Sequence, residues 1–368
     1  MRTLIAGGGT GGHLTPALAV ALALRDARPD GEVVVVGRRD GVAERLVVAA
    51  GLRLETLDVS GVDAGSPGGI ARATSQLTRA TIAARRLLRT MRPDVVVGAG
   101  GYVSVPVVAA AIAQRIPVVL LEQNAVPGRA TRLLARRARV VAASFAETAR
   151  HLPNAHVVHT GNPIRSEVRE VATRPIGDRL RTILVTGGSQ GARRLNRAVT
   201  GCLVDLLMSD PELSIVHQCG SLDHDDVALA AAALPPGLAS RYTLAAFFDD
   251  MAVRMAQSDL VVMRAGGSSL AECAALGRPM IVVPYPHAGG HQRHNASPYV
   301  DAGAALLIDD AACTPARLET EIRSLVADPP RWRAMAAAST ALGLPDATDS
   351  VVRLIVEAAG PDRRSNAA

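Results

Sequence analysis

Short runs of valine, isoleucine and leucine alternate with longer segments of mixed polarity along the whole chain. Apolar runs that are continuous, instead of alternating with polar residues, are typical of parallel strands that helices cover on both faces. The pattern therefore predicts an α/β fold built on parallel sheets. The clearest predicted strands are VVVVG from Val33, DVVVGAG from Asp94, PVVLLEQN from Pro117, TILVTGG from Thr182, DLVVMRAGG from Asp259 and PMIVVPYP from Pro279.

Two Thr-Pro pairs mark predicted helix starts. Thr15-Pro16 precedes ALAVALALRDA, and Thr314-Pro315 precedes ARLETEIRSLVA. Threonine caps helix N-termini, and proline is tolerated in the first turn because the N–H group there has no acceptor within the helix. We therefore expect one helix to begin at each pair.

The motifs of the first half return in the same order in the second half. A strand leads into GGGTGG and a later strand into GAGGY, and the second half repeats this layout with GGSQGA and MRAGGSS. A chain of 368 residues is too long for one compact hydrophobic core. The repeat therefore predicts two Rossmann-like domains that face a cleft. We expect an N-terminal domain over residues 1–160, a C-terminal domain over 161–345, and a C-terminal helix and tail over 346–368 whose helix returns to the N-terminal domain.

Composition excludes several classes of protein. The net charge is +6, and all 40 basic residues are arginine. The absence of lysine rules out a Walker A lysine and a lysine Schiff base. Aromatic residues make up only 2%, so we expect no nucleic-acid partner. The four cysteines lack Cys-x-x-Cys spacing, which argues against a zinc ribbon. Neither a signal-peptide pattern nor a membrane-spanning apolar stretch is present, so an integral membrane protein is not expected.

The first glycine run allows two interpretations. Gly7, Gly9 and Gly12 fit the dinucleotide fingerprint, but Arg38 and Arg39 stand where a NAD site wants an acidic residue, which leaves an NADP site open. The run GGSQGA opens a helix, and a helix N-terminus suits a pyrophosphate. Alternatively, the glycines only permit tight turns.

Eight motifs follow one another along the chain: GGTGGH, GGYVS, LEQN, GNPIR, GGSQGA, FFDDM, RAGGSSLAE and HQRHNA. Together they resemble the lipid II-forming N-acetylglucosaminyltransferases of glycosyltransferase family 28, which have the GT-B fold. The resemblance implies inverting transfer of GlcNAc from UDP-GlcNAc to the MurNAc 4-hydroxyl of undecaprenyl-pyrophosphoryl-MurNAc-pentapeptide (lipid I) in peptidoglycan synthesis, with no cofactor.

The resemblance also implies substrate-binding residues. The C-terminal domain would hold the donor, with Glu272 accepting hydrogen bonds from ribose hydroxyls. Gly267 and Ser269 replace the alanine and threonine usual in the family. The implied residues are Thr10, Gly11, Gly12 and Asn124 in the first domain and Arg165, Ser189, Phe248, Gly267, Ser268, Ser269, Leu270, Ala271, Glu272, Gln292 and Asn295 around the donor.

Three residues are candidates for the chemistry. His13 is the candidate base that takes the proton of the acceptor hydroxyl, or else a helix-capping histidine that only shapes the loop or contacts a phosphate. Glu122 is a second candidate base, which could equally orient an arginine. Arg264 would hold the leaving diphosphate, or else pair with an acidic neighbour. Metal is not expected, because we see no Asp-x-Asp of the kind that metal-dependent glycosyltransferases use to hold Mg²⁺, and the His287/His291 spacing falls on a poor helix.

The segment 69–91 reads as an amphipathic helix. Arg72, Arg79 and Arg86 recur opposite Leu77, Ala84 and Met91 in the sequence. Charge beside an apolar stripe suits docking on anionic lipids, at the cytoplasmic face of the plasma membrane in this case, and an ordinary surface helix is the alternative. Other functions also stay open: a UDP-GlcNAc epimerase, another GT-B glycosyltransferase, or a non-catalytic sugar-nucleotide-binding protein.

Overall fold

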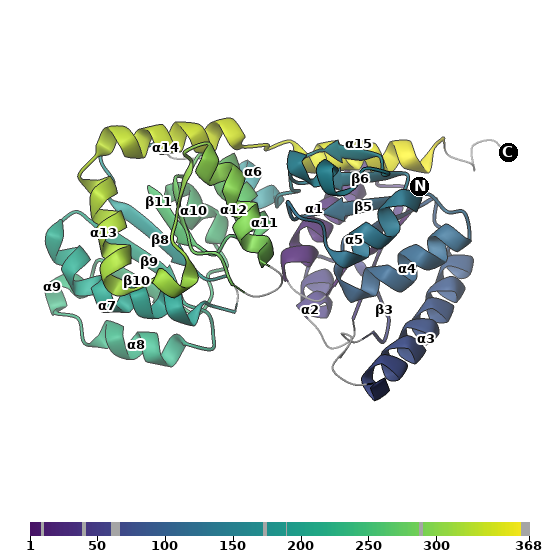
Figure 1. Ribbon diagram of the computed structural model, residues 1–368, viewed down its shortest axis with the longest axis horizontal. Coiled ribbons are helices and arrows are strands. Elements are labelled where there is room, and N and C mark those ends of the chain that lie inside the picture. Colours follow the sequence, from purple (N-terminus) through teal and green to yellow (C-terminus); the bar gives the residue numbers. More distant parts are fainter. Residues whose placement is uncertain are drawn as a thin grey trace. The chain divides into compact units, whose positions relative to one another are not determined.

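The computed structural model describes residues 1–8, 11–38, 42–59, 67–171, 175–188, 190–286 and 290–361. Thr10, Ser189 and His287 of the sequence predictions lie outside these ranges, as does the side chain of Arg72. The chain forms two compact units: unit 1 comprises residues 1–165 and 346–368, and unit 2 comprises residues 166–345 (Figure 1).

Unit 1 is built on a seven-stranded sheet in which every ladder is parallel, in the order β3-β2-β1-β4-β5-β6-β7. The predicted strands at Val33, Asp94 and Pro117 are confirmed. The order reverses between β1 and β4, which is where ligands bind in open sheets of this kind. The strands are β1 (Arg2–Ala6), β2 (Glu32–Gly37), β3 (Arg53–Thr56), β4 (Val95–Gly98), β5 (Val118–Glu122), β6 (Val140–Ala143) and β7 (Val157–His159).

Helices cover both faces of this sheet. Because side chains alternate along a strand, Leu4 and Ala6 face the core under α3 and α4, whereas Ile5 faces the core under α1 and α15. The last helix, α15, runs along α1 and the strands β4, β5 and β6 (Figure 1). The helices of unit 1 are α1 (Gly11–Ala27), α2 (Val42–Ala49), α3 (Pro67–Met91), α4 (Gly101–Ala113), α5 (Arg129–Leu134), η1 (Ala135–Arg137), η2 (Ala146–His151) and α15 (Ala347–Ala359).

Unit 2 repeats the plan with a six-stranded parallel sheet in the order β10-β9-β8-β11-β12-β13. The predicted strands at Thr182, Asp259 and Pro279 are confirmed as β8, β11 and β12. The strands are β8 (Thr182–Thr186), β9 (Ser214–Gln218), β10 (Tyr242–Ala245), β11 (Leu260–Met263), β12 (Met280–Val282) and β13 (Ala305–Leu307). The helices are α6 (Ser166–Glu170), α7 (Arg193–Ser209), α8 (His224–Ala232), α9 (Pro236–Ala239), α10 (Met251–Gln257), α11 (Gly267–Ala275), α12 (His291–Asp301), η4 (Asp310–Ala312), α13 (Pro315–Val326) and α14 (Pro329–Leu342).

One of the two predicted helix starts is confirmed. The Thr314 side chain accepts a hydrogen bond from the Arg317 N–H group and caps α13. The other is wrong, because α1 begins at Gly11 and contains Pro16. Proline there costs only one hydrogen bond near the helix start, and burial of Leu14 beside it offsets that loss.

Candidate active site

The glycine turn of unit 1 lies at the carboxyl end of β1 and leads into α1. The N–H group of Gly7 donates to the carbonyl of Val36. Beyond it, Gly8 packs on the start of α4, so that a methyl group on Gly101 would overlap the Gly8 carbonyl oxygen. Gly101 also has a φ of 77°, which only glycine adopts easily. The motif GAGGY therefore lets two backbone segments meet at the switch point of the sheet.

His13, in the first turn of α1, is half-buried beside these segments. Its Nδ1 lies 2.9 Å from Oε1 of Gln123, and Nε2 of Gln123 donates to the carbonyl of Ala99 over 3.1 Å. Ala99 and Gln123 directly follow β4 and β5, which are neighbours in the sheet. The structure thus brings His13 together with the motif LEQN. The sequence assigned no role to Gln123, and no local signal marks its contact with a residue so far away in the chain.

Glu122 is 3% exposed and organises the loop that follows β5. Its Oε1 accepts hydrogen bonds from the N–H group and the side-chain amide of Asn124, and its Oε2 accepts from the N–H group of Gly128. Asn124 is thereby fixed at the carboxyl edge of the sheet. Three accepted hydrogen bonds occupy much of the capacity of this carboxylate.

The glycine turn of unit 2 connects β8 to α7. The N–H group of Gly188 donates to Oγ1 of Thr186, and that of Gly191 donates to the carbonyl of Gly188. A methyl group on Gly191 would overlap the carbonyl oxygen of Cys219, just beyond β9. The turn therefore packs against the segment after its neighbouring strand, as in unit 1, but on the β9 side.

A buried chain of hydrogen bonds supports this second turn. The hydroxyl of Tyr242 lies 2.8 Å from Nδ1 of His217, and Nε2 of His217 lies 3.0 Å from Oδ1 of Asn196. The Asn196 amide group donates to the carbonyl of Cys219 and to Asp223. Burial lowers the pKa of His217 to about 4, so its ring is neutral at pH 7. The sequence analysis missed this chain; its one local trace is a histidine inside the apolar strand SIVHQ.

Arg264 follows β11 and pairs with an acidic neighbour, the alternative that the sequence left open. Its Nη1 lies 2.6 Å from Oδ1 of Asp310 and also donates to the carbonyl of Val283. Oδ2 of the same carboxylate lies 3.1 Å from Nε of Arg194, in the first turn of α7. Two guanidinium groups and one carboxylate leave a net positive charge beside the N-terminus of α7, which favours an anion there.

The remaining predicted residues of unit 2 fall on three segments. The backbone N–H group of Phe248 donates to Gln218, and the guanidinium of Arg254 lies 3.9 Å from the centre of the Phe248 ring. On α12, Oε1 of Gln292 accepts from the N–H group of Tyr285. Asn295 is buried on the same helix. The helix α11 begins at Gly267 and carries Ser268, Ser269, Leu270, Ala271 and the buried Glu272.

Three details complete the predicted site. Leu270 is fully buried in the core, so it offers a ligand only its backbone. Arg165 is the last residue before unit 2. Across the ranges that the structure describes, histidine, cysteine, aspartate and glutamate side chains form no group of three that could hold a metal ion.

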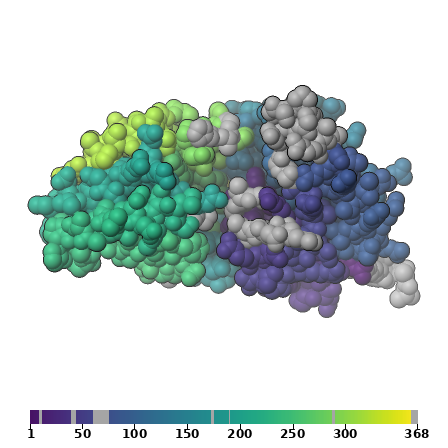
Figure 2. All heavy atoms as spheres, turned by 90° about the horizontal axis from the view of Figure 1, so that it is seen from below, coloured from purple at the N-terminus to yellow at the C-terminus, as the bar shows by residue number. Residues whose placement is uncertain are grey.

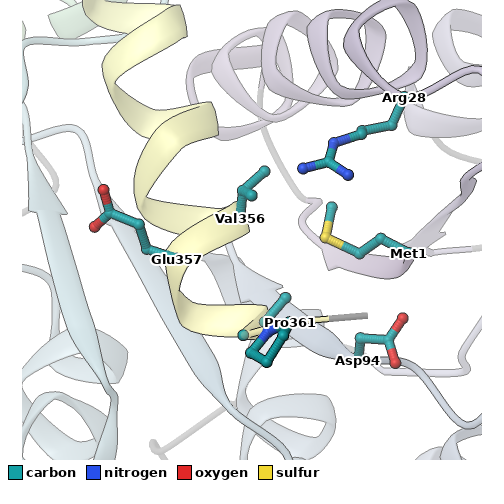
Figure 3. Close-up of a pocket in the computed structure, with 8 residues that line it drawn as sticks. Met1, Arg28, Asp94, Val356, Glu357 and Pro361 are labelled. Carbon is teal, nitrogen blue, oxygen red and sulfur yellow. The ribbon is translucent and has the colours of Figure 1, made fainter. Parts of the chain in front are cut away.

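A pocket of about 400 Å³ in unit 1 lies away from the glycine turns. It is lined by Met1 and Asp94, which precede β1 and β4, and by residues of α15 such as Val356, as Figure 3 shows. It therefore lies at the amino edge of the sheet. Ligands of parallel sheets bind at the opposite, carboxyl edge, where His13 lies.

The helix α3 contains the arginine-rich segment. Ala80, Ala84 and Leu88 are buried against the core of unit 1, and Met91 joins them. Of the predicted stripe, Ala84 and Met91 therefore lie on the core-facing side of the helix, whereas Leu77 is 40% exposed. No helix within the described part of the chain combines the length and the apolar character needed to cross a bilayer.

Comparison with known proteins adds the family. The glycosyltransferase family 28 N-terminal domain matches residues 3–143, and the family's C-terminal domain matches residues 182–351. The chain belongs to glycosyltransferase family 28. These two family 28 matches cover the glycine turns of both units.

Relatives of this family 28 chain match over nearly its whole length. A protein of Desulforudis audaxviator, named UDP-N-acetylglucosamine--N-acetylmuramyl-(pentapeptide) pyrophosphoryl-undecaprenol N-acetylglucosamine transferase, is 39% identical over 99% of this chain and 100% of its own. Acinetobacter baumannii MurG has a TM-score of 0.74 and 32% identity, over 96% of this chain and 98% of that one. A UDP-GlcNAc 2-epimerase of Neisseria meningitidis, solved with UDP-GlcNAc, has a TM-score of 0.68 over 97% of this chain and 100% of that one. At 16% identity it shares the fold alone.

Proposed function

We propose that this chain is the inverting transferase that moves GlcNAc from UDP-GlcNAc to the MurNAc 4-hydroxyl of lipid I, giving lipid II. The observation that carries the proposal is the 39% identity with a transferase of that name over 99% of the chain. The arrangement of His13 and the LEQN segment at the carboxyl edge of the unit 1 sheet supports it, because that edge is where such sheets bind ligands.

In this proposal unit 2 binds UDP-GlcNAc. The turn before α7, with Ser189, binds the diphosphate through backbone N–H groups, and Arg194 and Arg264 add positive charge. The ribose hydroxyls donate to Glu272 on α11. Further donor contacts come from the first turn of α11 and from residues around the nucleotide and the sugar: Arg165, Phe248, Gly267, Ser268, Ser269, Leu270, Ala271, Gln292 and Asn295.

Unit 1 binds lipid I and supplies the base. The acceptor oxygen attacks the anomeric carbon of GlcNAc, the bond from that carbon to the phosphate oxygen breaks, and UDP leaves with the electron pair. His13 takes the hydroxyl proton, while Thr10, Gly11, Gly12 and Asn124 hold the reacting groups. His13 is the better base than Glu122, because Glu122 already accepts three hydrogen bonds from its loop.

Release of UDP from UDP-GlcNAc, with and without a lipid I analogue, tests the function. We expect release only with the acceptor, a fall in kcat of roughly 100-fold or more in His13→Ala, and a raised KM for UDP-GlcNAc in Glu272→Ala. His151→Ala, on the exposed end of η2, is the control and should keep the wild-type rate. Equal release without acceptor would point to an epimerase or hydrolase, and donor binding without turnover to a non-catalytic protein.

We also propose that the outer side of α3 holds the enzyme at the cytoplasmic face of the plasma membrane. Arg79 and Arg86 are exposed there, and the exposed Ile82 lies on the same side, three residues after Arg79 and four before Arg86. Figure 2 draws the chain around α3 in blue. Anionic lipid headgroups attract such arginines with roughly 1 kcal/mol each. The core-facing side of α3 is already covered, so docking uses this outer side only.

Sedimentation with vesicles tests the docking proposal. Vesicles of anionic lipid should bind the protein, and neutral vesicles should bind it at least about tenfold more weakly. Arg79→Glu/Arg86→Glu should lose the difference. The matched control reverses two exposed arginines of unit 2, Arg197→Glu/Arg331→Glu, and should bind as the wild type does. Equal loss in both double variants would show that net charge alone attracts the protein.

A further inference from the structure

We infer that Gln123 is a positioning residue that fixes the tautomer of His13, with the proton on Nδ1 and the lone pair on Nε2. The inference rests on the proposed function, because it gives His13 the state in which it takes a proton. It concerns the contact of His13, in the first turn of α1, with the segments that follow β4 and β5.

The direction of each hydrogen bond follows from the one before it. The Ala99 carbonyl can only accept, so the atom of Gln123 that faces it is the amide nitrogen Nε2. The other atom of that amide, Oε1, then faces His13 and can only accept as well. Nδ1 of His13 must therefore donate. In a neutral imidazole the proton on Nδ1 leaves the lone pair on Nε2.

Burial prevents the Gln123 amide from turning over. Gln123 is 4% exposed. In the turned orientation its oxygen would face the Ala99 carbonyl, and its amide hydrogens would face Nδ1. Two facing acceptors without water lose a hydrogen bond and repel each other, which disfavours this orientation. The amide therefore has one stable orientation.

Gly100 gives the imidazole its place in this arrangement. A Cβ atom at this position would lie 2.8 Å from Nδ1 of His13 and 3.1 Å from Cε1. Any side chain there would push the ring away from Gln123. Gly100 also has a φ of 92°, so the same residue satisfies a backbone and a packing requirement.

Nitrogen NMR on protein labelled with ¹⁵N-histidine tests the tautomer directly. The wild type should show His13, assigned by its loss in His13→Ala, with Nδ1 protonated and Nε2 bare at a pH where the ring is neutral. In Gln123→Leu, which has similar volume but no amide, the ring should become a mixture of both tautomers. A wild-type His13 protonated on Nε2 would overturn the inference.

Kinetics separate a positioning role from a structural one. Gln123→Leu should lower kcat at least about tenfold, while KM for UDP-GlcNAc stays within about twofold. In a His13→Ala background the same change should cost nothing further, because Gln123 acts only through the imidazole. Gln123→Glu keeps an acceptor for Nδ1 but no donor for Ala99, and should restore part of kcat.

The failures of this inference and of the proposed function are distinguishable. Additive losses in Gln123→Leu and His13→Ala would overturn the positioning role even where His13 is essential. A His13→Ala enzyme with the full rate would remove His13 as the base. The NMR spectrum of the wild type would still show whether His13 has the tautomer that Gln123 is inferred to fix. That measurement does not depend on the folding of a Gln123 variant.

Discussion

The two glycine turns of this protein follow the first strand of each unit, yet different partners hold them. In unit 1 the turn packs on Gly101 beside β4, and the adjacent histidine, His13, is half-buried with Nδ1 bound to Gln123. In unit 2 the turn packs beside β9, and the supporting histidine, His217, is fully buried with both ring nitrogens in hydrogen bonds. The same kind of backbone turn is therefore accompanied by a half-buried histidine in one unit and by a fully buried one in the other.

Hydrogen bonding also limits what His217 can do. A base needs a lone pair that solvent or substrate can reach, and His217 has none, because Tyr242 donates to one nitrogen and the other donates to Asn196. His217 instead ties β9 and β10 to the start of α7. Histidine identity alone is thus a weak sign of function, and the partners of the ring decide its role.

The largest expected effect is on the packing of the unit 2 turn. Gly191→Ala should destabilise unit 2 by more than about 4 kcal/mol, since the methyl group overlaps the Cys219 carbonyl at a φ of 78°. Gly188→Ala is the matched control, with a φ of 84° and open space, and should cost about 1–2 kcal/mol. Urea unfolding followed by fluorescence of Trp332, the single tryptophan, measures unit 2. Equal losses would show that backbone conformation alone fixes the turn.

The next effect removes the buried histidine. His217→Ala leaves a cavity and strips Tyr242 and Asn196 of a partner, so we expect a loss of about 4 kcal/mol in the free energy of unfolding. The exposed His294 of α12 provides the control, and His294→Ala should stay within about 0.5 kcal/mol of the wild type. A His217→Ala variant as stable as that control would show that His217 has no structural role.

Low pH should weaken the hydrogen bonds of His217. The pKa of His217 is lowered from 6.5 to about 4 by burial, so the unfolded chain binds this proton more readily than the folded one. Stability is therefore complete above pH 6.5 and falls as the pH decreases toward 4, by about 3 kcal/mol. The stability gap between wild type and His217→Ala should close by this amount over that range. A gap that is constant with pH would contradict a neutral buried ring.

The sequence predicts those parts of this fold that have local causes. Valine-rich runs and glycine turns identified six strands and both turns, because burial on two faces and positive φ leave a mark in consecutive residues. β3 was missed because Arg53 and Glu55 break the apolar pattern at the sheet edge. The start of α1 was misplaced because proline is an ambiguous signal near a helix start.

Candidate site residues could be selected one by one from the sequence, but the contacts between them could not. His13 and Glu122 stood out as titratable residues beside a glycine turn and at a strand end. The hydrogen bonds of Glu122 are local, but the contacts of His13 with Gln123 and of Arg264 with Asp310 join residues far apart in the chain. Only the parallel order of β1, β4 and β5 brings the first pair together, and a single sequence does not encode that order locally.

The smallest expected effect completes the comparison. His13→Ala should change the free energy of unfolding by less than about 1 kcal/mol, because water can replace the hydrogen bond of the half-buried ring to Gln123. Urea unfolding followed by circular dichroism, with hydrogen exchange of the β1 and β4 amides, measures this change in unit 1. A loss as large as that of His217→Ala would make His13 a structural histidine too. Stability that is kept while turnover falls at least about 100-fold would instead assign the two histidines opposite roles.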